Sequence, residues 1–561
     1  MESEESSQRP EVFVKSITFN DEHTFEFNRS DTVVFTGTNN SGKSQVLKEI
    51  YNSFHSKDAY ALPKIVIKVD NNFLGGIDLL ISNAKRNIKG ECLIGNLYLN
   101  EHYIRSWWNT RRLNAICEYF INYLNTEKRL SSSNSPDSFD SINMPPQHPI
   151  QYLYVDDEKE KELSRYFYCA FNMNLIVDRG AGNIIPLFVG NSPEFNEGED
   201  RVSKSYRERL IQLPKLQEQG DGMRSFAGIL LDTFTSQHSI TLIDEPEAFL
   251  HPPQARLLGK MLAETPNNRQ LFVSTHSEDF IKGLLNANNE NVKIIRINRD
   301  KNINKMSILK NDDIKLLWND SILRYSNILS GLFHSKVVIC ESDNDCRFYQ
   351  AIMDTLDNED NKKISSDILF THCGGKQRLK TVTKALKALN VKIVTIADID
   401  VLDDKNTLQS ITDSLNIDWG TINSSWNIIN NYVKPQKSEL NGDNIKKEIR
   451  EIVDIIPDGC SFPQKSANEI KKVLKSSTAW LKIKETGKAF FKGKGYNAFN
   501  EIDNICKRKG LFIVPVGELE QFYKVSASHG SKWLNEVLET DLKNSNELKA
   551  AREFVDEIIK Y

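Results

Sequence analysis

The sequence predicts an α/β protein with two domains, each built around a parallel β-sheet. A chain of 561 residues is too long for a single hydrophobic core. Short apolar runs of strand length alternate with helical stretches in both halves of the chain, which is typical of parallel sheets. This alternation starts afresh at the run KVVIC, residues 336–340, so a domain boundary is expected near residue 330.

In the first domain, residues 1–330, the runs VFVKSITF and TVVFTG between residues 11 and 37 predict strands. A helix over 44–54, a helix over 222–236 and strands at 239–243 and 270–275 follow. Residues from about 100 to 210 are expected to form a largely helical insertion. Within it, the Ser- and Pro-rich segment 131–149 predicts a flexible surface loop.

In the second domain, residues 331–561, strands are predicted at 336–340, 367–371, 392–397 and 511–516. Residues from about 405 to 505 have a helical pattern and are expected to be inserted before the last of these strands. The order of strands and helices favours a second parallel sheet.

Composition excludes several classes of protein. Hydrophobic residues at 39% and charged residues at 26% are ordinary for a globular chain, and no apolar run reaches the length of a membrane span. The polar start MESEESSQRP is unlike a signal peptide. Eight single cysteines without a CxxC pair argue against a zinc site and favour a cytoplasmic protein. With a net charge of −4, any nucleic acid must be held by a local basic patch.

A nucleotide site is predicted where the second strand meets the helix at 44–54. The segment GTNNSGKS matches G-x-x-x-x-G-K-[ST], whose glycines let backbone amides face phosphate oxygens at a helix N-terminus. Lys43 would bring a positive charge to the β- and γ-phosphates, and Ser44 would offer its hydroxyl to Mg²⁺. The residues predicted to bind ATP are Gly37, Asn39, Asn40, Ser41, Gly42, Lys43, Ser44 and Asp244.

Two acids after a later apolar run predict the hydrolytic part of this site. The run ITLI is followed by Asp244, a predicted ligand of the ATP-site Mg²⁺, and by Glu245, predicted to polarise the attacking water. Such an ending is also common for ordinary strands. Here Pro246-Glu247 follows directly, and the segment STHS with His276 follows the next strand, which makes the pattern specific.

The order of these motifs resembles that of ABC-type ATPases, in particular the branch that includes SMC, RecF and OLD proteins. In that branch His276 would be the switch histidine that contacts the γ-phosphate. The segment GDGMRS, residues 220–225, stands where the signature loop reaches the nucleotide of a second protomer, although it departs from LSGGQ. A buried structural histidine and a simple loop are the plainer interpretations. The resemblance implies a homo-oligomer, dimer or tetramer, formed through the ATPase domain.

Acidic residues also follow two strands of the second domain. Glu341 and Asp345 come after the strand at 336–340, and Asp398 and Asp400 come after the strand at 392–397. Chemistry in open parallel sheets lies at this carboxyl edge, and residues i and i+2 of an extended chain point to the same side. Converging carboxylates favour a hard cation such as Mg²⁺, and two such metals can catalyse phosphodiester cleavage. Taken singly, each acid could be a solvated turn residue.

This pattern resembles the Toprim domain, with its glutamate after the first strand and its later DxD. The resemblance makes Glu341, Asp398 and Asp400 the catalytic acids and metal ligands, with Asp345 as a further ligand. Ser342 replaces a glycine that many Toprim domains carry there. Glu518 and Glu520 follow the last strand and could add carboxylates to a metal. Among family members a downstream lysine assists cleavage, and Lys532 is the candidate here, although a plain surface lysine is an equal alternative.

Two basic stretches could hold DNA. Residues 465–496 contain nine lysines and four aromatic residues, which either bind phosphates and stack on bases or form a solvated helix face over core aromatics. The shorter stretch from Lys376 to Lys387 follows the glycine turn Gly374-Gly375 and borders the predicted metal site. It is the more natural path for a phosphate backbone that enters this site.

An ABC-type ATPase followed by a Toprim domain resembles the OLD (overcoming lysogenization defect) nuclease family, which includes the Gabija nuclease subunit and OLD-type effectors of some retrons. The resemblance implies nicking or double-strand cleavage of DNA with Mg²⁺ or Mn²⁺ under ATP control, in bacterial defence against phage. Expected partners are DNA, further copies of the chain, and a helicase-like protein or a retron reverse transcriptase with its RNA/DNA.

Two other functions compete with this interpretation. One is a non-cutting ATPase scaffold for DNA repair, similar to RecF or SMC proteins. The acids at Glu341, Asp398 and Asp400 argue against it. The other is a topoisomerase or primase built on a Toprim domain, but the sequence contains neither a recognisable catalytic tyrosine domain nor a template-binding module.

Overall fold

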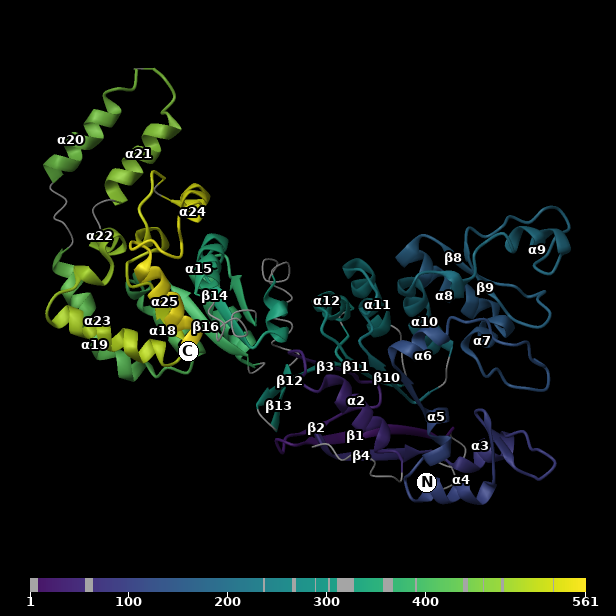
Figure 1. Cartoon of the computed structure of the whole chain (residues 1–561). Coiled ribbons are helices and arrows are strands. Elements are labelled where there is room, and N and C mark those ends of the chain that lie inside the picture. Colours follow the sequence, from purple (N-terminus) through teal and green to yellow (C-terminus); the bar gives the residue numbers. More distant parts are fainter. Residues whose placement is uncertain are drawn as a thin grey trace. The chain divides into compact units, whose positions relative to one another are not determined.

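The structure is a computed structural model of the whole chain (Figure 1). It describes residues 9–55, 64–235, 238–264, 269–287, 289–300, 303–309, 327–356, 367–388, 391–436, 442–457, 459–475, 479–527 and 529–561. The chain divides into two compact units, Met1–Asn311 and Asp312–Tyr561. This division falls before the boundary near residue 330 that the sequence predicts.

The first unit contains a six-stranded sheet with the order β13-β12-β3-β11-β10-β7. The neighbours from β12 to β7 pair in parallel, whereas β13 is antiparallel to β12 at one edge. Because parallel strands end at the same edge, the segments after β3, β10 and β11 lie side by side. The strands are β3 (Thr32–Gly37), β7 (Ile121–Leu124), β10 (Ile240–Asp244), β11 (Gln270–Ser274), β12 (Val292–Asp300) and β13 (Ile303–Leu309).

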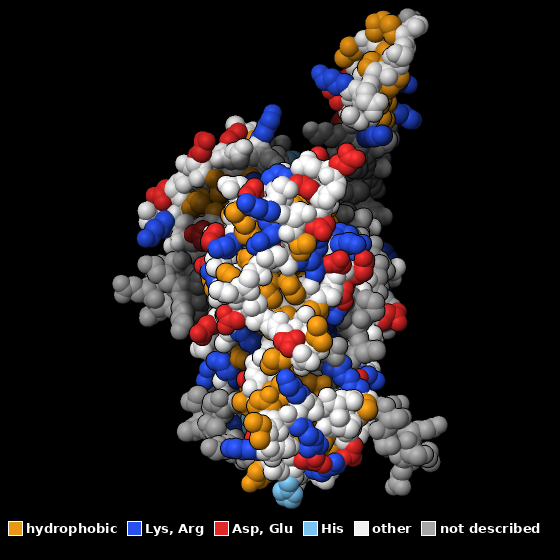
Figure 2. All heavy atoms as spheres, turned by 90° about the vertical axis from the view of Figure 1, so that its right-hand side faces the viewer, with side chains coloured by type: hydrophobic (Ala, Val, Ile, Leu, Met, Phe, Trp, Pro, Cys, Tyr) orange, Lys and Arg blue, Asp and Glu red, His pale blue; other side chains and the backbone are white. Residues whose placement is uncertain are grey.

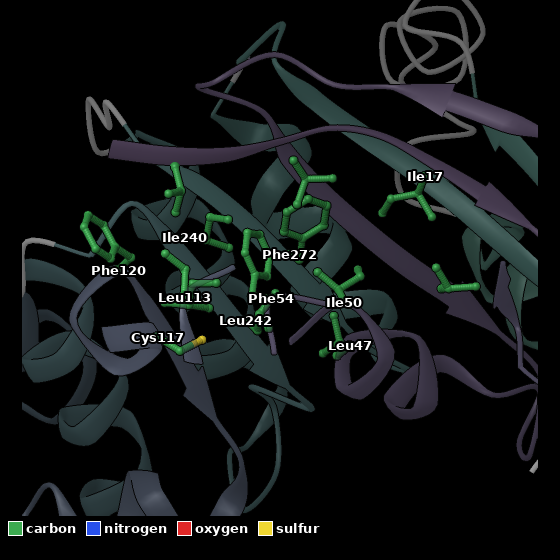
Figure 3. Close-up of a cluster of buried hydrophobic side chains, with 14 of the residues drawn as sticks. Ile17, Leu47, Ile50, Phe54, Leu113, Cys117, Phe120, Ile240, Leu242 and Phe272 are labelled. Atoms are coloured by element: carbon green, nitrogen blue, oxygen red, sulfur yellow. The ribbon is translucent and has the colours of Figure 1, made fainter. Parts of the chain in front are cut away.

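The central strands of this sheet are covered on both faces. Every residue of β3 and β11 is buried, which explains why TVVFTG and QLFVS lack the alternation of a half-exposed strand. On one face lie α2 (Lys43–Asn52) and an antiparallel sheet of β2, β1 and β4. Figure 3 shows Leu47, Leu242 and Phe272 in the cluster that α2, β10 and β11 share. The strands of the small sheet are β1 (Glu11–Phe19), β2 (Thr24–Glu26) and β4 (Val66–Leu74).

The segment from about 100 to 210 is only partly an insertion. The sequence predicts it to be largely helical, but β7 within it pairs with β10 as an edge strand of the main sheet. Four residues, INYL, between helical stretches give too short a pattern to be recognised. Its other elements are α4 (Glu101–Asn109), α5 (Cys117–Phe120), α6 (Thr126–Ser131), α7 (Pro149–Val155), α8 (Asp157–Phe171), β8 (Asn174–Val177), β9 (Leu187–Gly190) and α9 (Lys204–Leu210).

The Ser- and Pro-rich segment between α6 and α7 has an irregular path that hydrogen bonds tie to the rest of the unit. The Ile185 amide donates to Pro136 O over 2.8 Å, and the Ser138 amide donates to Asn183 O over 2.9 Å. The segment ends at α7, whose first turn is capped by a reciprocal pair of hydrogen bonds between His148 and Gln151. Its backbone is therefore anchored beside the turn that precedes β9.

Three helices complete the region around the predicted nucleotide site. α10 (Asp221–Thr235) begins within the GDGMRS segment, and α11 (Pro252–Glu264) follows the turn after β10. α12 (Glu278–Asn286) is capped by Ser277, the last residue of STHS, whose hydroxyl accepts a hydrogen bond from the Phe280 amide over 3.2 Å. The unit also contains α3 (Ile77–Asn83), β5 (Cys92–Ile94) and β6 (Leu97–Leu99).

The second unit contains a four-stranded, fully parallel sheet with the order β15-β14-β16-β17. The first strand, β14, lies between the two strands that follow it in sequence, so the chain reverses its direction of travel across the sheet beside β14. Ligand sites in such sheets lie at this point, outside the carboxyl ends of the strands. The strands are β14 (Lys336–Cys340), β15 (Ile368–His372), β16 (Lys392–Ala397) and β17 (Leu511–Ile513).

The strand predicted over 511–516 is shorter than expected. It ends at Ile513, because Pro515 has no amide hydrogen and the chain then turns away through Gly517. On one face of the sheet, α15 (Asp343–Thr355), α24 (Gly530–Leu538) and α25 (Lys549–Lys560) share a core with β14 and β16. α17 (Lys376–Ala388) packs against β14 and β16.

In its described residues, the predicted helical stretch before the last strand contains six α-helices. α19 and α23 pack on each other, while α20 and α21 form a pair that Figure 1 shows extending from the rest of this unit. Ile455 and Phe462, between α20 and α21, are exposed. The helices are α18 (Lys405–Ser414), α19 (Trp419–Val433), α20 (Gly442–Val453), α21 (Gln464–Lys475), α22 (Ala479–Thr486) and α23 (Lys494–Lys507).

Two general properties follow from the described ranges. None of their helices combines the length and apolarity needed to cross a membrane. Among the described residues on the face drawn in Figure 2, basic, acidic and hydrophobic side chains are interspersed.

Candidate functional site

The segment GTNNSGKS forms a tight backbone loop between β3 and α2. Gly37 has φ +144°, and a Cβ there would lie 2.2 Å from Ile297 O, so only glycine fits this close approach to β12. Asn40 and Gly42 also adopt positive φ values, 62° and 97°. The loop thus brings its amides to the N-terminus of α2, which is the arrangement that binds phosphate.

Lys43 lies against the loop that it is predicted to serve. Its Nζ donates hydrogen bonds to Gly37 O over 3.1 Å and to Thr38 O over 3.0 Å. Burial lowers the pKa of Lys43, an effect that the negative charges of Glu245, Glu247 and Asp244 oppose. The ammonium therefore lies at the centre of the predicted phosphate site, held by two carbonyl oxygens.

Ser44 and Asp244 are brought together, as expected for two ligands of one magnesium ion. Ser44 Oγ donates to Asp244 Oδ1 over 2.8 Å, although the two residues lie 200 positions apart in the sequence. Ser274, at the end of β11, donates to the same carboxylate oxygen. The hydroxyl of Ser44 and the carboxylate of Asp244 match the hard oxygen donors that Mg²⁺ prefers.

Glu245, Glu247 and His276 form the hydrolytic corner. Glu245 adopts a positive φ of 50°, and its Oε1 lies 3.6 Å from His276 Nδ1. Glu247 Oε1 is 3.2 Å from the same nitrogen and also accepts a hydrogen bond from the His276 amide over 2.8 Å. Burial raises the pKa of Glu247. The half-exposed His276 and Glu245 side chains are thus accessible, while Glu247 fixes the turn beneath them.

Arg129 supports this corner, and no sequence motif identifies this residue. Its side chain is fully buried, and its guanidinium donates to the backbone carbonyl of Asp244 and, over 3.2 Å, to Thr126 Oγ1. Burial lowers the pKa of Arg129, opposed by the charges of Glu247, Asp244 and Glu245. A buried cation in α6 thereby holds the turn that carries Asp244 and Glu245.

The GDGMRS segment is attached to the same helix, α6. Arg224 Nη2 donates to Leu130 O and Arg224 Nε to Ser133 Oγ, each over 3.1 Å. At Gly228, one turn further along α10, a Cβ would lie 2.1 Å from Arg129 O. Through α6, the signature-like segment is in contact with the turn after β10. A role of this segment at a second protomer's nucleotide stays a prediction.

Asn304 of β13 fixes the phosphate loop from the other side. The buried Asn304 Nδ2 donates to Ser41 O over 2.7 Å. Its amide donates to Asn20 Oδ1 over 2.9 Å, and Asn20 Nδ2 returns a bond of 3.2 Å to Asn304 Oδ1. This residue follows the nucleotide motif by more than 250 positions, so sequence spacing could not reveal it.

In the second unit, three of the predicted acids converge at the carboxyl ends of β14 and β16. The register pairs Ile339 with Thr395, which places Glu341 next to the start of the Asp398–Asp400 turn. The Asp398 amide donates to Glu341 Oε1 over 3.3 Å. The structure thus places Glu341 and Asp398 at the same edge of the sheet, and their role as metal ligands stays a prediction.

Two lysines lie among these carboxylates. Lys376, at the start of α17, has its Nζ 3.3 Å from Asp400 Oδ2. Lys484 of α22 is closer to the centre: its Nζ lies 3.6 Å from Asp398 Oδ2, 3.4 Å from Asp400 Oδ2 and 3.3 Å from Glu518 Oε2. Glu518, after β17, therefore joins the acids that follow β14 and β16.

Glu520 lies at the edge of this cluster together with a residue that the sequence did not suggest. His529 Nδ1 is 3.5 Å from Glu520 Oε1 and 3.8 Å from Glu518 Oε1. One ligand atom from each of the three residues lies within 4.8 Å of the other two, a spacing suited to a metal ion. Glu520 Oε1 also accepts a hydrogen bond from the Gly530 amide over 3.1 Å, which fixes its position.

Asp345 has a structural role beside its predicted one. Its Oδ2 accepts a hydrogen bond from the Ser342 amide over 2.8 Å, and Ser342 Oγ accepts one from the Asp345 amide, so the two residues cap α15. Burial raises the pKa of Asp345, and the negative charge of Glu520 adds to this effect. The Asp345 carboxylate thus caps the first turn of α15 and lies close to the other acids.

The acids of this cluster are costly to ionise together. Burial raises the pKa of Glu341 to about 6, with Asp400 and Asp345 adding to the shift. Burial also raises the pKa of Asp398 well above its ordinary range, and the charge of Glu341 adds to the shift. For Lys484, burial lowers the pKa, but Asp400, Asp398 and Glu518 outweigh it and raise the pKa overall. Such an excess of oxygen donors fits a divalent cation.

The basic stretches differ in how their residues are used. On α17, Lys380 and Lys384 are exposed one turn apart. In the stretch 465–496, Phe491 is buried and packs on Phe499 with ring centroids 5.6 Å apart, so it cannot stack on a base. The side chains of Lys472 and Lys475 lie outside the described residues. Lys532, on α24, is exposed, and within the described ranges the lysines that contact the carboxylates are Lys376 and Lys484; the role of Lys532 stays a prediction.

The folds and geometries of the two units define a P-loop ATPase domain followed by a TOPRIM domain. Residues 33–281 match the family described as "AAA domain, putative AbiEii toxin, Type IV TA system". Residues 332–400 match the family described as "Overcoming lysogenization defect protein-like, TOPRIM domain". Two parts of the chain therefore match an AAA-type ATPase domain and an OLD-like TOPRIM domain, which confirms the predicted fold class and the order of the two domains, whereas the resemblance to the Gabija subunit and to retron-associated effectors stays a prediction.

A curated relative carries the same family name. The chain is 26% identical over 214 residues to a protein named OLD nuclease from Thermus scotoductus, an alignment that covers 35% of this chain. It spans 38% of the length of that relative. Among solved structures, the chain is similar to an SMC head bound to the C-winged helix domain of ScpA, with 12% identity and a TM-score of 0.32 over 54% of this chain and 98% of that one. An SMC head domain from Thermotoga maritima gives 11% identity and a TM-score of 0.28 over 53% of this chain and 98% of that one.

Proposed function

We propose that this protein is an ATP-binding, divalent-metal-dependent DNA endonuclease that nicks or cleaves DNA under the control of ATP. The observation that carries the proposal is the convergence of Glu341, Asp398, Asp400 and Glu518 at one sheet edge. These acids come from three separate strand ends, and their oxygens are the donors that Mg²⁺ or Mn²⁺ takes. Their combination with a phosphate-binding loop in one chain is what the OLD-like domain order leads us to expect.

The residues of the second unit divide the work of phosphodiester hydrolysis. Glu341, Asp398 and Asp400 would hold the cation, and Glu518, Glu520, His529 and Asp345 would provide donors for a second one. A cation held by these residues would supply the chemistry of the reaction, since it would make the attacking water more acidic and would stabilise the leaving oxygen. The exposed Lys380 and Lys384 of α17 guide the DNA backbone toward Lys376, whose ammonium lies at the carboxylates. Lys532 is proposed to assist cleavage.

The residues of the first unit supply the control. The loop from Gly37 to Ser44 and the ammonium of Lys43 bind the phosphates of ATP, and Ser44 with Asp244 holds its Mg²⁺. Glu245 orients the attacking water, and His276 contacts the γ-phosphate of ATP. We propose that ATP joins two protomers through this domain, giving a dimer or tetramer.

The biological role that we propose is defence of a bacterial cytoplasm against phage. It rests on the OLD-like TOPRIM match and on the resemblance to Gabija and retron-associated effectors. A helicase-like protein, or a retron reverse transcriptase with its RNA/DNA, is the corresponding partner. Efficiency of plating of phage on cells that carry the wild-type protein or Asp398→Ala tests this role. Equal plating on both would remove it.

The enzymatic proposal is tested by nicking of supercoiled plasmid. Purified full-length protein is incubated with Mg²⁺ or Mn²⁺, with and without ATP, beside Asp398→Ala and Lys43→Ala. We expect cutting by wild type that EDTA and Asp398→Ala abolish, and a dependence on ATP that Lys43→Ala removes. The sign of the ATP effect tells whether the nucleotide licenses the nuclease or restrains it.

Three outcomes contradict the proposal in different ways. No cutting with either metal would favour a non-cutting scaffold similar to RecF or SMC proteins. Cutting that Asp398→Ala leaves intact would point to a contaminating nuclease. Religated topoisomers among the products would favour a topoisomerase activity of the TOPRIM domain.

A further inference from the structure

The most unusual feature of the carboxylate cluster is the lysine at its centre. Lys484 Nζ lies within 3.3–3.6 Å of one oxygen from each of Asp398, Asp400 and Glu518. The three acids come from the sheet edge, whereas the lysine comes from α22, in the helical segment inserted between β16 and β17. A single ammonium thereby bridges acids that follow two different strands.

The position of this lysine is fixed by close contact of two backbones. At Gly517, which has φ +117°, a Cβ would lie 1.9 Å from Lys484 O. At Gly487, three residues after the lysine, a Cβ would lie 2.3 Å from Pro515 O, and the Lys488 amide donates to that oxygen over 2.8 Å. The end of α22 is thus fastened to the turn that carries Glu518. These backbone contacts hold the base of the Lys484 side chain next to the cluster, whereas a lysine on a free surface has no such restraint.

An ammonium and a divalent cation placed among these oxygens compete for the same space. The carboxylates lie 3.3–3.6 Å from the nitrogen, whereas Mg²⁺ requires oxygens at about 2.1 Å in a near-octahedral shell. Two positive charges at such close range also repel each other strongly in a partly buried site. The four-carbon stem of lysine has enough rotatable bonds to withdraw its charge without movement of α22.

We propose that Lys484 is a built-in competitor of the divalent cation in the TOPRIM unit. In the metal-free protein its ammonium holds Asp398, Asp400 and Glu518 together and keeps the carboxylates from repelling one another. A cation that enters displaces this ammonium, so the site is ordered in advance but binds metal less tightly than its carboxylates alone would allow. The inference rests on the proposed function in one respect, because it takes the cluster to be a metal site.

The test is the affinity of the nucleotide-free, full-length protein for Mn²⁺, measured by titration calorimetry and by the loss of the free-Mn²⁺ electron paramagnetic resonance signal. Lys484→Met removes the charge and keeps the length of the side chain. We expect it to bind Mn²⁺ at least about tenfold more tightly than wild type. Lys484→Arg, which keeps the charge, must not bind more tightly than wild type.

The matched control is Lys482→Met, an exposed lysine on the same helix, which must leave the Mn²⁺ affinity unchanged. Asp398→Asn combined with Lys484→Met must lose the tightened binding, which assigns it to this cluster. Should Lys484→Met fold poorly by its circular dichroism and melting temperature, Lys484→Gln must show the same tightening.

The outcomes separate this inference from the proposed function. If wild type binds Mn²⁺ and the neutral variants bind it equally or more weakly, Lys484 supports the metal site and the inference is overturned. If wild type neither binds Mn²⁺ in a manner that Asp398→Asn removes nor cuts DNA, the metal site itself is disproved.

Discussion

The two candidate sites of this chain solve opposite electrostatic problems. The first unit prepares a place for the anionic phosphates of a nucleotide, with backbone amides, a helix N-terminus and Lys43 supplied by eight consecutive residues. The second unit prepares a place for a cation. Its carboxylates come from Glu341, Asp398 and Glu518, and the first and last of these lie nearly 180 positions apart in the sequence. A backbone loop can form an anion site locally, whereas a cation site of side-chain oxygens needs a sheet to collect them.

Each site also contains a cation next to its acidic residues, and the two cations are used differently. In the first unit, the buried guanidinium of Arg129 lies under the acidic turn and contacts its backbone. In the second, the ammonium of Lys484 lies among the acids themselves. Arg129 therefore shapes its site permanently, while Lys484 occupies the space of a ligand.

The largest expected effects test whether the two sites bind their ligands independently of each other. We expect Lys43→Ala to weaken ATP binding at least about a hundredfold, because a phosphate contact to a charged donor is lost. Asp398→Asn is expected to reduce metal-dependent cutting at least about a thousandfold. Each variant should keep the binding function of the other unit, measured with a fluorescent ATP analogue and with Mn²⁺. Loss of Mn²⁺ binding in Lys43→Ala would show that the sites are not independent.

The role of Arg129 as a permanent support predicts a specific kinetic pattern. Arg129→Met leaves the Asp244 carbonyl without its buried donor and releases the turn on which Glu245 holds a positive φ. We expect the kcat of ATP hydrolysis to fall by roughly 10- to 100-fold, with the KM for ATP changed less than about threefold. Arg129→Lys should recover part of the rate. A rise in KM at unchanged kcat would place Arg129 in nucleotide binding instead.

These supports also show where the sequence stops being informative. The strands at 239–243, 270–275, 336–340 and 392–397 were predictable, because buried parallel strands are continuous apolar runs. The short edge strand β7 was not, since four residues between helices resemble a helical turn. The last strand was predicted too long, because its apolar run continues through Pro515 after pairing has ended.

The same limit applies to the sites. The phosphate loop could be predicted because all of its residues are contiguous, and the acids because each directly follows a strand. Arg129, Asn304, Lys484 and His529 follow no motif, and they reach the sites through helix packing and loop paths that local patterns do not determine. Only the count of lysines before the last strand included Lys484, and it suggested DNA rather than the carboxylates.

The raised pKa of Glu341 predicts that the stability of the second unit depends on pH. Glutamate has an ordinary pKa of about 4.3, and burial raises that of Glu341 to about 6. The folded state therefore binds the proton more tightly than the unfolded chain. The stabilising effect of the proton bound to Glu341 is complete below a pH of about 4 and is lost as the pH rises through about 6. In metal-free protein this amounts to about 2 kcal/mol at most.

Urea denaturation in EDTA at pH 5 and pH 7 measures this effect on wild type and Glu341→Gln. We expect the loss of unfolding free energy between the two pH values to be smaller in Glu341→Gln. An equal loss in both proteins would mean that Glu341 ionises as freely as a glutamate in water. The Lys43→Ala variant, altered only in the other unit, should behave like wild type.

The smallest expected effect concerns Asn304, which supports the phosphate loop from outside that loop. Asn304 donates from Nδ2 to Ser41 O over 2.7 Å and exchanges two further hydrogen bonds with Asn20. Asn304→Ala leaves one loop carbonyl without its buried donor, which costs about 1 kcal/mol and should raise the Kd for ATP by roughly fivefold. Ile303→Ala, at an exposed neighbour on β13, is the control, and a fluorescent ATP analogue measures both. If Asn304→Ala binds ATP as wild type does, the eight-residue loop is sufficient by itself, and the contrast between a local anion site and a collected cation site becomes sharper.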